Sequence, residues 1–137
     1  MPRPSRRFDA VLFDMDGVLV DSVRAWNDVR VAYAAAHGGR WELDDQHAVM
    51  GANSLEWATI MRDRLKIDAP VDQILADVVA GVVGEYRRGT VSVLPGAPEA
   101  VRRIATRWPV GLASSSHLDL ITAALDLLGL EGVFGAV

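Results

Sequence analysis

The chain has 137 residues and a net charge of −4, half of its residues are hydrophobic, and it contains no cysteine. Its length suits one domain with a real hydrophobic core, and its interspersed charges offer no basic surface for nucleic acid or for an anionic membrane. The absence of cysteine excludes disulfide bonds and thiolate metal sites and fits a cytoplasmic location. Because no basic surface is expected, the expected partners are small molecules.

The first residues differ in character from the segment that follows them. Residues 1–7, MPRPSRR, are rich in Pro and Arg and are expected to be frayed. No apolar signal core follows them, because Asp9, Asp14 and Asp16 interrupt the apolar run, and secretion by a signal peptide is not expected. Residues 11–13, VLF, instead predict a short strand that is buried on both faces of a parallel sheet.

Two acidic residues follow this strand directly. Asp14 and Asp16 lie at its carboxyl end, which is the edge where ligands bind in open α/β sheets. Gly17 allows the backbone to turn there. Because two carboxylates so close together repel each other, the pair predicts either a hard divalent cation between the acids and a phosphate, or a proton on one of them.

A long helical stretch separates this strand from the next one. Its clearest signal is the run from Pro70 to Arg88, where apolar residues recur at the i, i+3, i+4, i+7 spacing of a helix face. Glycines and polar cap residues delimit the other helices. The expected helices are 23–37 after a Ser22 cap, a short turn at 44–50, a helix from an Asn53 or Ser54 cap through residue 65, and 70–88 before Gly89.

After residue 89 the pattern returns to strands that alternate with helices. A Pro-Gly turn begins a helix, and a second apolar run predicts another buried strand with three serines at its carboxyl end. The expected order is a linker or short extended piece at 91–94, a turn at 95–98, a helix that Pro109 ends, a strand at 110–113, the loop Ser114-Ser115-Ser116 with Ser116 as a helix cap, a helix at 118–128, and the opening of a third strand at 133–137.

The compound pattern of strand, Asp14-Met15-Asp16-Gly17, apolar residues and Asp21-Ser22 resembles the first motif of the haloacid dehalogenase (HAD) superfamily of phosphatases and phosphomutases. The order of strand, helical insertion and Pro-Gly return to a second strand also resembles this family, in its β-phosphoglucomutase-like branch. The resemblance implies an α/β fold with a Rossmann-like core, residues 1–22 and 90–137, and an inserted all-helical cap, residues 23–89.

The resemblance implies a role for each of the two acids. Asp14 would be the nucleophile that forms an aspartyl-phosphate, and Asp16 would be the general acid and then the general base. Mg²⁺ would be bound by the Asp14 carboxylate and the Asp16 main-chain carbonyl. The dehalogenase and phosphonate-cleaving branches lack an acid at the position of Asp16, so the resemblance favours phosphate-ester chemistry.

Further site candidates carry weaker signals. Ser114 corresponds to the family's second motif, a hydroxyl that hydrogen-bonds the phosphate, and Ser115 offers a backbone amide to the same group. Asn53 lies where relatives present a substrate-specificity loop. His117 is a candidate contact for substrate or a phosphate, as in some relatives, although an exposed histidine in the first turn of a helix is the favoured interpretation. Plain helix capping explains Asn53 equally well, and for Ser114 it is the less favoured alternative to phosphate binding. Asp21 and Ser22 are expected to bond backbone amides, and none of His37, His47 and His117 is expected to bind a metal.

Two motifs of the family have no counterpart in this sequence. The third motif is a Lys or Arg and the fourth is an acidic pair, both after the third strand, whereas Lys66 lies in the expected cap. We therefore expect an N-terminal fragment with an unpaired sheet edge, through which copies could associate.

Three functions stay open: a Mg²⁺-dependent phosphatase of a small phosphorylated metabolite such as a sugar phosphate, a phosphomutase of the β-phosphoglucomutase type, and an inactive remnant that serves as a binding module. The stretch MGANSLEW has no Arg or Lys to hold a second phosphate, which favours hydrolysis.

Overall fold

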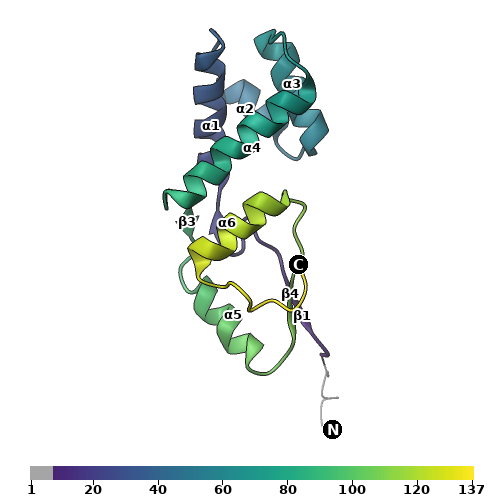
Figure 1. Cartoon of the computed structure of the whole chain (residues 1–137), viewed down its shortest axis with the longest axis vertical. Helices are drawn as coiled ribbons and strands as arrows, with labels where there is room; N and C mark the ends of the chain where they lie inside the picture. The colour runs from purple at the N-terminus through teal and green to yellow at the C-terminus, as the bar shows by residue number, and fades with distance from the viewer. Residues whose placement is uncertain (1–7) are drawn as a thin grey trace. The chain divides into compact units, whose positions relative to one another are not determined.

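The computed structural model describes residues 8–137, so the expected fraying of residues 1–7 lies outside the described residues. The chain divides into two compact units (Figure 1). The core unit comprises residues up to Ser22 together with 91–137, and the helical unit comprises residues 23–90. That each unit is a domain of its own stays a prediction. None of the described helices combines the length and the apolar character that a membrane crossing requires.

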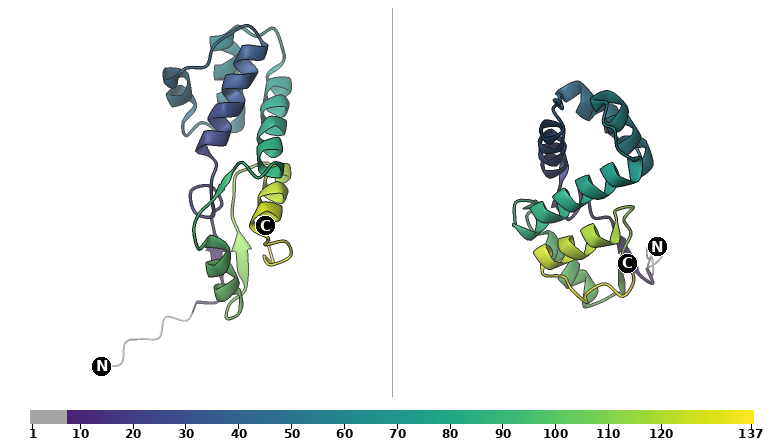
Figure 2. Two further views of the ribbon diagram at one scale, coloured as in Figure 1. Left: turned by 90° about the vertical axis from the view of Figure 1, so that its left-hand side faces the viewer. Right: turned by 45° about the horizontal axis from the view of Figure 1, so that its top comes forward.

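The core unit is built on a parallel strand pair. Strand β1 (Val11–Phe13) pairs in parallel with β4 (Val110–Leu112), with Phe13 opposite Leu112. Ala136 adds a parallel bridge on β4, so the expected third strand is present as a single bridge. Helices α5 (Ala97–Ala105) and α6 (Leu118–Leu128) lie on the same side of the strand pair, as right-handed crossovers require (Figures 1 and 2).

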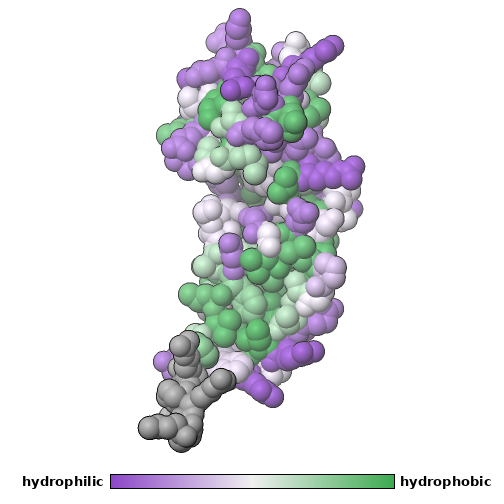
Figure 3. Space-filling model, turned by 180° about the vertical axis from the view of Figure 1, so that it is seen from behind, coloured by the Kyte–Doolittle hydropathy of each residue, from purple (hydrophilic) through white to green (hydrophobic). Residues whose placement is uncertain are grey.

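The predicted burial of the first strand on both faces is wrong for Leu12. This side chain is 72% exposed, whereas every residue of β4 is buried. Leu12 points to the face opposite Val11 and Phe13, and α5 and α6 cover only one face. In the described part of the chain β1 pairs only with β4. Figure 3 shows apolar side chains gathered over the core unit, and Phe8 is exposed there as well. Association of copies through this edge stays a prediction.

The segment after Asp16 folds back in a tight turn. Gly17 has a φ of 78°, a left-handed conformation that glycine adopts without strain, and its N–H donates to the Val20 carbonyl at 2.8 Å. Strand β2 (Val20–Asp21) then pairs antiparallel with β3 (Ser92–Val93), a small sheet that the sequence did not predict. The turn brings Ser22 back to the side chain of Asp16.

The helical unit has the expected helices, each within one or two residues of its predicted ends. Its cap at Asn53 is confirmed: the side chain accepts from Glu56 N at 2.9 Å, and the Glu56 side chain accepts from Asn53 N at 3.1 Å. Helix α4 packs against α1 and α3, and Gly81 permits this because a Cβ there would lie 2.6 Å from Val29 Cγ1. The helices are α1 (Val23–Ala36), α2 (Leu43–Val49), α3 (Ser54–Leu65) and α4 (Val71–Arg87).

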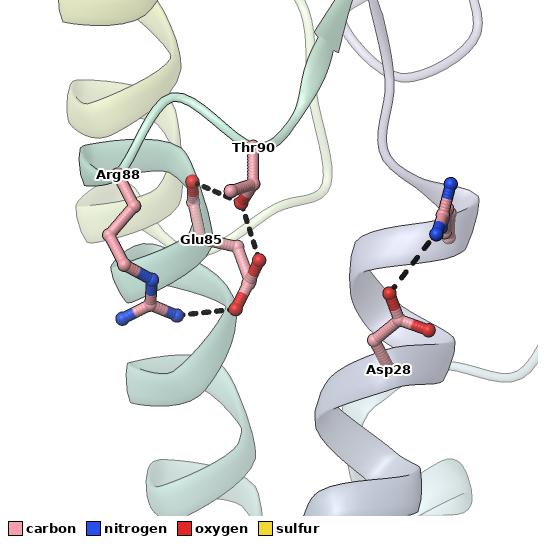
Figure 4. A network of polar contacts seen from close by, with 5 residues as sticks. Asp28, Glu85, Arg88 and Thr90 are labelled. Carbon is pink, nitrogen blue, oxygen red and sulfur yellow. Dashed lines mark hydrogen bonds and ion pairs between the residues drawn. The ribbon is translucent and has the colours of Figure 1, made fainter.

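A small polar network closes the end of α4. The Glu85 carboxylate accepts hydrogen bonds from Thr90 and Arg88, and the Thr90 hydroxyl also contacts the Glu85 carbonyl at 2.9 Å (Figure 4). These bonds, that of Thr90 first, lower the pKa of Glu85. Arg24 and Asp28 form a separate exposed pair on α1, with 3.6 Å between Nε and Oδ2. The charges at these two places therefore neutralise each other locally.

Candidate active site

The two strands of the core unit end at the same edge. Ala113 N donates to the Phe13 carbonyl at 2.8 Å, which keeps the chains in register just past both strands. Asp14 and Ser114 therefore leave the sheet side by side, at the carboxyl edge where α/β proteins bind ligands. Asp14 is exposed and Ser114 is half-buried. The structure thus brings the first acid and the first serine of the predicted site to one edge.

Two hydroxyls hold the Asp16 carboxylate. Ser22 Oγ donates to Asp16 Oδ1 at 2.6 Å, and Ser116 Oγ donates to Asp16 Oδ2 at 3.1 Å. Ser22 is only 4% exposed, so its hydroxyl has few other orientations available. The two bonds therefore fix the orientation of Asp16 before any ligand is bound.

The loop after β4 is linked to Asp16 through Ser116. Ser116 N donates to Ser114 Oγ at 3.1 Å, a local turn in which a serine side chain accepts from the backbone two residues ahead. The expectation that Ser116 caps α6 is wrong: the N-cap residue is His117, without a side-chain cap bond, because the Ser116 hydroxyl donates to Asp16. The Ser22 hydroxyl, expected to bond backbone amides, likewise donates to Asp16.

Asp14 presents a carboxylate at the surface of this edge. Its Oδ1 accepts from Met15 N at 2.7 Å, and it makes no other side-chain hydrogen bond to the residues that the structure describes. Met15 itself is 1% exposed and anchors the backbone between the two acids in the core. Asp14 therefore has a fixed backbone and an accessible oxygen, which is what a nucleophile requires.

The charge of the two acids has no counterion among the described residues. Neither Asp14 nor Asp16 forms an ion pair with any residue in the range 8–137. Their oxygens are hard ligands that suit Mg²⁺, which commonly binds through one or two carboxylates and completes its shell with water and phosphate oxygens. The described residues contain no group of three acidic, His or Cys side chains that would form a fuller metal site. The donor set therefore fits Mg²⁺ bound jointly with a phosphate.

The other candidate residues lie in different settings. Ser115 is exposed on the loop after β4, and His117 is half-buried at the start of α6. Asn53 belongs to the helical unit, where its side chain caps α3. Their roles toward phosphate or substrate stay predictions. Sequence reasoning missed Ser22 and Ser116 as partners of Asp16, because only the turn at Gly17 and the β1–β4 register bring them there.

Comparison with known proteins identifies the family. Residues 8–137 match the haloacid dehalogenase-like hydrolases. The chain is 29% identical over 137 residues to hexitol phosphatase B of Escherichia coli K12, covering 96% of this chain and 60% of that protein. The crystal structure of the putative β-phosphoglucomutase from Thermotoga maritima superposes with a TM-score of 0.76 at 25% identity, covering 94% of this chain and 60% of that one.

A third relative supports the fold alone. The structure of CbbY from Rhodobacter sphaeroides, solved in complex with phosphate, has a TM-score of 0.78 at 18% identity and covers 95% of this chain and 62% of its own. The present chain thus spans about 60% of the length of hexitol phosphatase B. The expected α/β fold with a Rossmann-like core and an inserted helical segment is confirmed. The chain belongs to the haloacid dehalogenase-like hydrolases.

Proposed function

We propose that these residues are part of a Mg²⁺-dependent phosphatase that hydrolyses a small phosphorylated metabolite, such as a sugar phosphate, through an aspartyl-phosphate on Asp14. The observation that supports this most is the hydrogen-bonded set of Asp16, Ser22, Ser116 and Ser114 beside the exposed Asp14 carboxylate. Similarity to hexitol phosphatase B supports a sugar-type substrate.

In the first step a carboxylate oxygen of Asp14 attacks phosphorus and the bond from phosphorus to the ester oxygen breaks. The departing oxygen takes the proton of the Asp16 carboxyl group, so the alcohol leaves neutral. Ser22 and Ser116 keep Asp16 oriented during this transfer, since each holds one of its two oxygens. Ser114 and the amide of Ser115 bind phosphoryl oxygens.

In the second step a water molecule attacks phosphorus of the aspartyl-phosphate. Asp16, now a carboxylate, takes a proton from this water, and the bond between phosphorus and Asp14 breaks to release inorganic phosphate and the free acid. The Asp14 carboxylate and the Asp16 main-chain carbonyl would hold Mg²⁺, which would supply positive charge against the phosphoryl oxygens. The two steps restore both acids to their starting states.

A phosphomutase is the second candidate, and similarity to the Thermotoga maritima structure supports it. A mutase returns the phosphoryl group from Asp14 to another hydroxyl of the sugar, whereas a phosphatase passes it to water. Incubation with β-glucose 1-phosphate separates the two activities. Glucose 6-phosphate without phosphate release would indicate the mutase, and release of inorganic phosphate would indicate the phosphatase.

Turnover of p-nitrophenyl phosphate tests the proposed function. We expect hydrolysis that requires Mg²⁺, is lost in Asp14→Asn, and is unchanged in Asp68→Asn, an exposed acid of the helical unit. A folded chain without turnover that still binds phosphate only when Mg²⁺ is present would favour the inactive binding module. Turnover that survives Asp14→Asn would exclude the proposed mechanism.

A further inference from the structure

A second charged cluster is built from residues of the helical unit alone. Arg30, on α1, is only 6% exposed, which is unusual for an arginine. Its guanidinium carbon lies 5.0 Å from the ring centroid of Trp26 and 5.1 Å from that of Trp57. The two indoles pack edge to face, with 5.7 Å between centroids. Cation–π contacts of this kind hold a guanidinium in place without neutralising it.

The hydrogen bonding of this arginine is incomplete. Arg30 Nη1 donates to Gln46 Oε1 at 3.3 Å, and the same oxygen accepts from Trp41 Nε1 at 3.1 Å. Arg30 Nε is buried and has no hydrogen-bond partner among residues 8–137. A guanidinium carries five N–H donors, so one shared amide oxygen satisfies a small part of its capacity. The cluster is therefore short of acceptors.

The cluster also lacks negative charge. Arg30 forms no ion pair with any described residue. Asp28, two residues before Arg30, pairs with Arg24, and Asp45, next to Gln46, pairs with Arg64. Burial lowers the pKa of Arg30 to about 10, which still leaves the side chain charged at neutral pH. Buried charges in proteins are ordinarily paired, because leaving one uncompensated is strongly destabilising.

We propose that Arg30 and Gln46, framed by Trp26, Trp41 and Trp57, form a binding site for a phosphate group within the helical unit. A phosphate supplies the missing charge, and its oxygens can accept from Nε and a terminal nitrogen of one guanidinium at the same time. Trp26, which covers one face of the guanidinium, is only half-buried, so the cluster lies near the surface. The inference does not depend on the proposed phosphatase activity.

The indole N–H signals of the full chain offer a direct test. Three of the four tryptophans frame the site, and Trp108 lies in the core unit. In a ¹H–¹⁵N spectrum assigned with Trp→Phe variants, titration with inorganic phosphate is expected to shift the signals of Trp26, Trp41 and Trp57 in a saturable way and to leave that of Trp108 unmoved. Absence of these shifts in the unmodified chain would overturn the proposal.

Substitutions locate the binding and separate it from the core unit. Arg30→Met keeps an apolar chain between the indoles and removes the charge, so the shifts are expected to disappear. Arg24→Met makes the same change at a 93% exposed position of the same helix and should leave them intact. Ser114→Ala, which alters the proposed phosphate loop of the core unit, should also leave them intact. Shifts that persist in Arg30→Met, or vanish in Ser114→Ala alone, would contradict the proposal.

A second variant keeps the proposal testable if Arg30→Met does not fold. Gln46→Glu keeps the side-chain shape and places a carboxylate against Arg30, so the cluster becomes paired and should no longer bind phosphate. Undiminished phosphate shifts in Gln46→Glu would overturn the proposal even if Arg30→Met does not fold. Titration with glycerol 3-phosphate then distinguishes the source: equal shifts support a phosphate ester of a metabolite as the ligand, and shifts with inorganic phosphate alone support free phosphate.

Discussion

The Ser116 hydroxyl donates a hydrogen bond to Asp16 Oδ2 at 3.1 Å, although the two residues are 100 positions apart in the chain. The bond joins the loop after β4 to the acid after β1. It can form only in the observed strand register, because a shift of the pairing would carry Ser116 along the sheet edge and away from Asp16. The orientation of the acid therefore depends on a contact that no local sequence pattern contains.

Ser22→Ala tests how much this arrangement stabilises the core unit. Ser22 is buried and loses its bond to Asp16, so we expect the free energy of unfolding to fall by about 1 kcal/mol, the usual net contribution of one hydrogen bond. Ser116→Ala should cost less, because its bond is longer and more exposed. Urea unfolding measures both, and the exposed neighbour Ser115→Ala is the matched control with no expected change. Equal effects of all three variants would contradict the assignment.

Gly17→Ala tests the turn between Asp16 and Ser22. Gly17 adopts a φ of 78° and nothing lies within 4 Å of a Cβ placed there, so the substitution meets backbone strain without a clash. We expect a loss of about 1–2 kcal/mol, the cost of a left-handed conformation for an ordinary residue. Gly17→Asn should recover part of it, since asparagine tolerates this conformation better. Thermal unfolding of the unmodified chain, Gly17→Ala and Gly17→Asn measures these differences. An unchanged midpoint in Gly17→Ala would be inconsistent with the described turn.

Gly81→Ala tests the packing of α4 on α1. The new methyl group would lie 2.6 Å from Val29 Cγ1, and a β-branched side chain has few rotamers into which it can move. We expect a destabilisation of about 1–3 kcal/mol from overpacking. Gly84→Ala, in the same helix, faces only the flexible end of Arg88 and should be neutral or stabilising by up to about 1 kcal/mol. Urea unfolding measures the free energy of unfolding of both variants. A larger loss in Gly84→Ala than in Gly81→Ala would contradict the described packing of α4 on α1.

Asp45→Asn tests the start of α2 and gives a pH dependence. The Glu42 amide first, and then the Arg64 side chain, lower the pKa of Asp45 below its ordinary value of 3.8. The charged form is therefore favoured by folding, so its contribution is present above about pH 4 and is lost as the pH falls through the lowered pKa. We expect Asp45→Asn to cost about 1 kcal/mol at pH 7, as for a lost helix cap.

The pH series provides the decisive comparison for Asp45. The gap in unfolding free energy between the unmodified chain and Asp45→Asn should stay constant down to about pH 4 and close at lower pH. Asp44→Asn, at the adjacent first-turn acid without a side-chain hydrogen bond to a described residue, should show a smaller gap. A gap for Asp45→Asn that widens as the pH falls would contradict the assigned direction.

Most of the helices could be predicted from the sequence because their signals are local. The apolar spacing of α4 and the Asn53 cap of α3 each lie within one stretch of chain, and the observed ends agree with the prediction. Asp14 and Asp16 could be placed at a strand end for the same reason, because the apolar run that precedes them is adjacent in the sequence. The small β2–β3 sheet was missed because its four residues, Val20–Asp21 and Ser92–Val93, carry no periodic pattern.

The partners of the site residues depended on tertiary contacts that the sequence does not display. The bonds of Ser22 and Ser116 to Asp16 arise from a turn and a strand register. The burial of Arg30 was likewise hidden, since an arginine between Val29 and Val31 on a predicted helix gives no sign that its guanidinium packs against two indoles. The exposure of Leu12 went unpredicted because an apolar run indicates a strand without stating what covers each face.

The proposed mechanism requires that Asp14 becomes phosphorylated during turnover. Rapid quenching of the full chain with p-nitrophenyl phosphate and Mg²⁺, followed by borohydride reduction and peptide mass spectrometry, measures this directly, because borohydride reduces an aspartyl-phosphate to homoserine. Phosphorylation of Asp14 predicts homoserine at position 14 only, and only in samples that contain both the substrate and Mg²⁺. Turnover that leaves Asp14 unmodified, or homoserine at position 16 or any other aspartate, would contradict it.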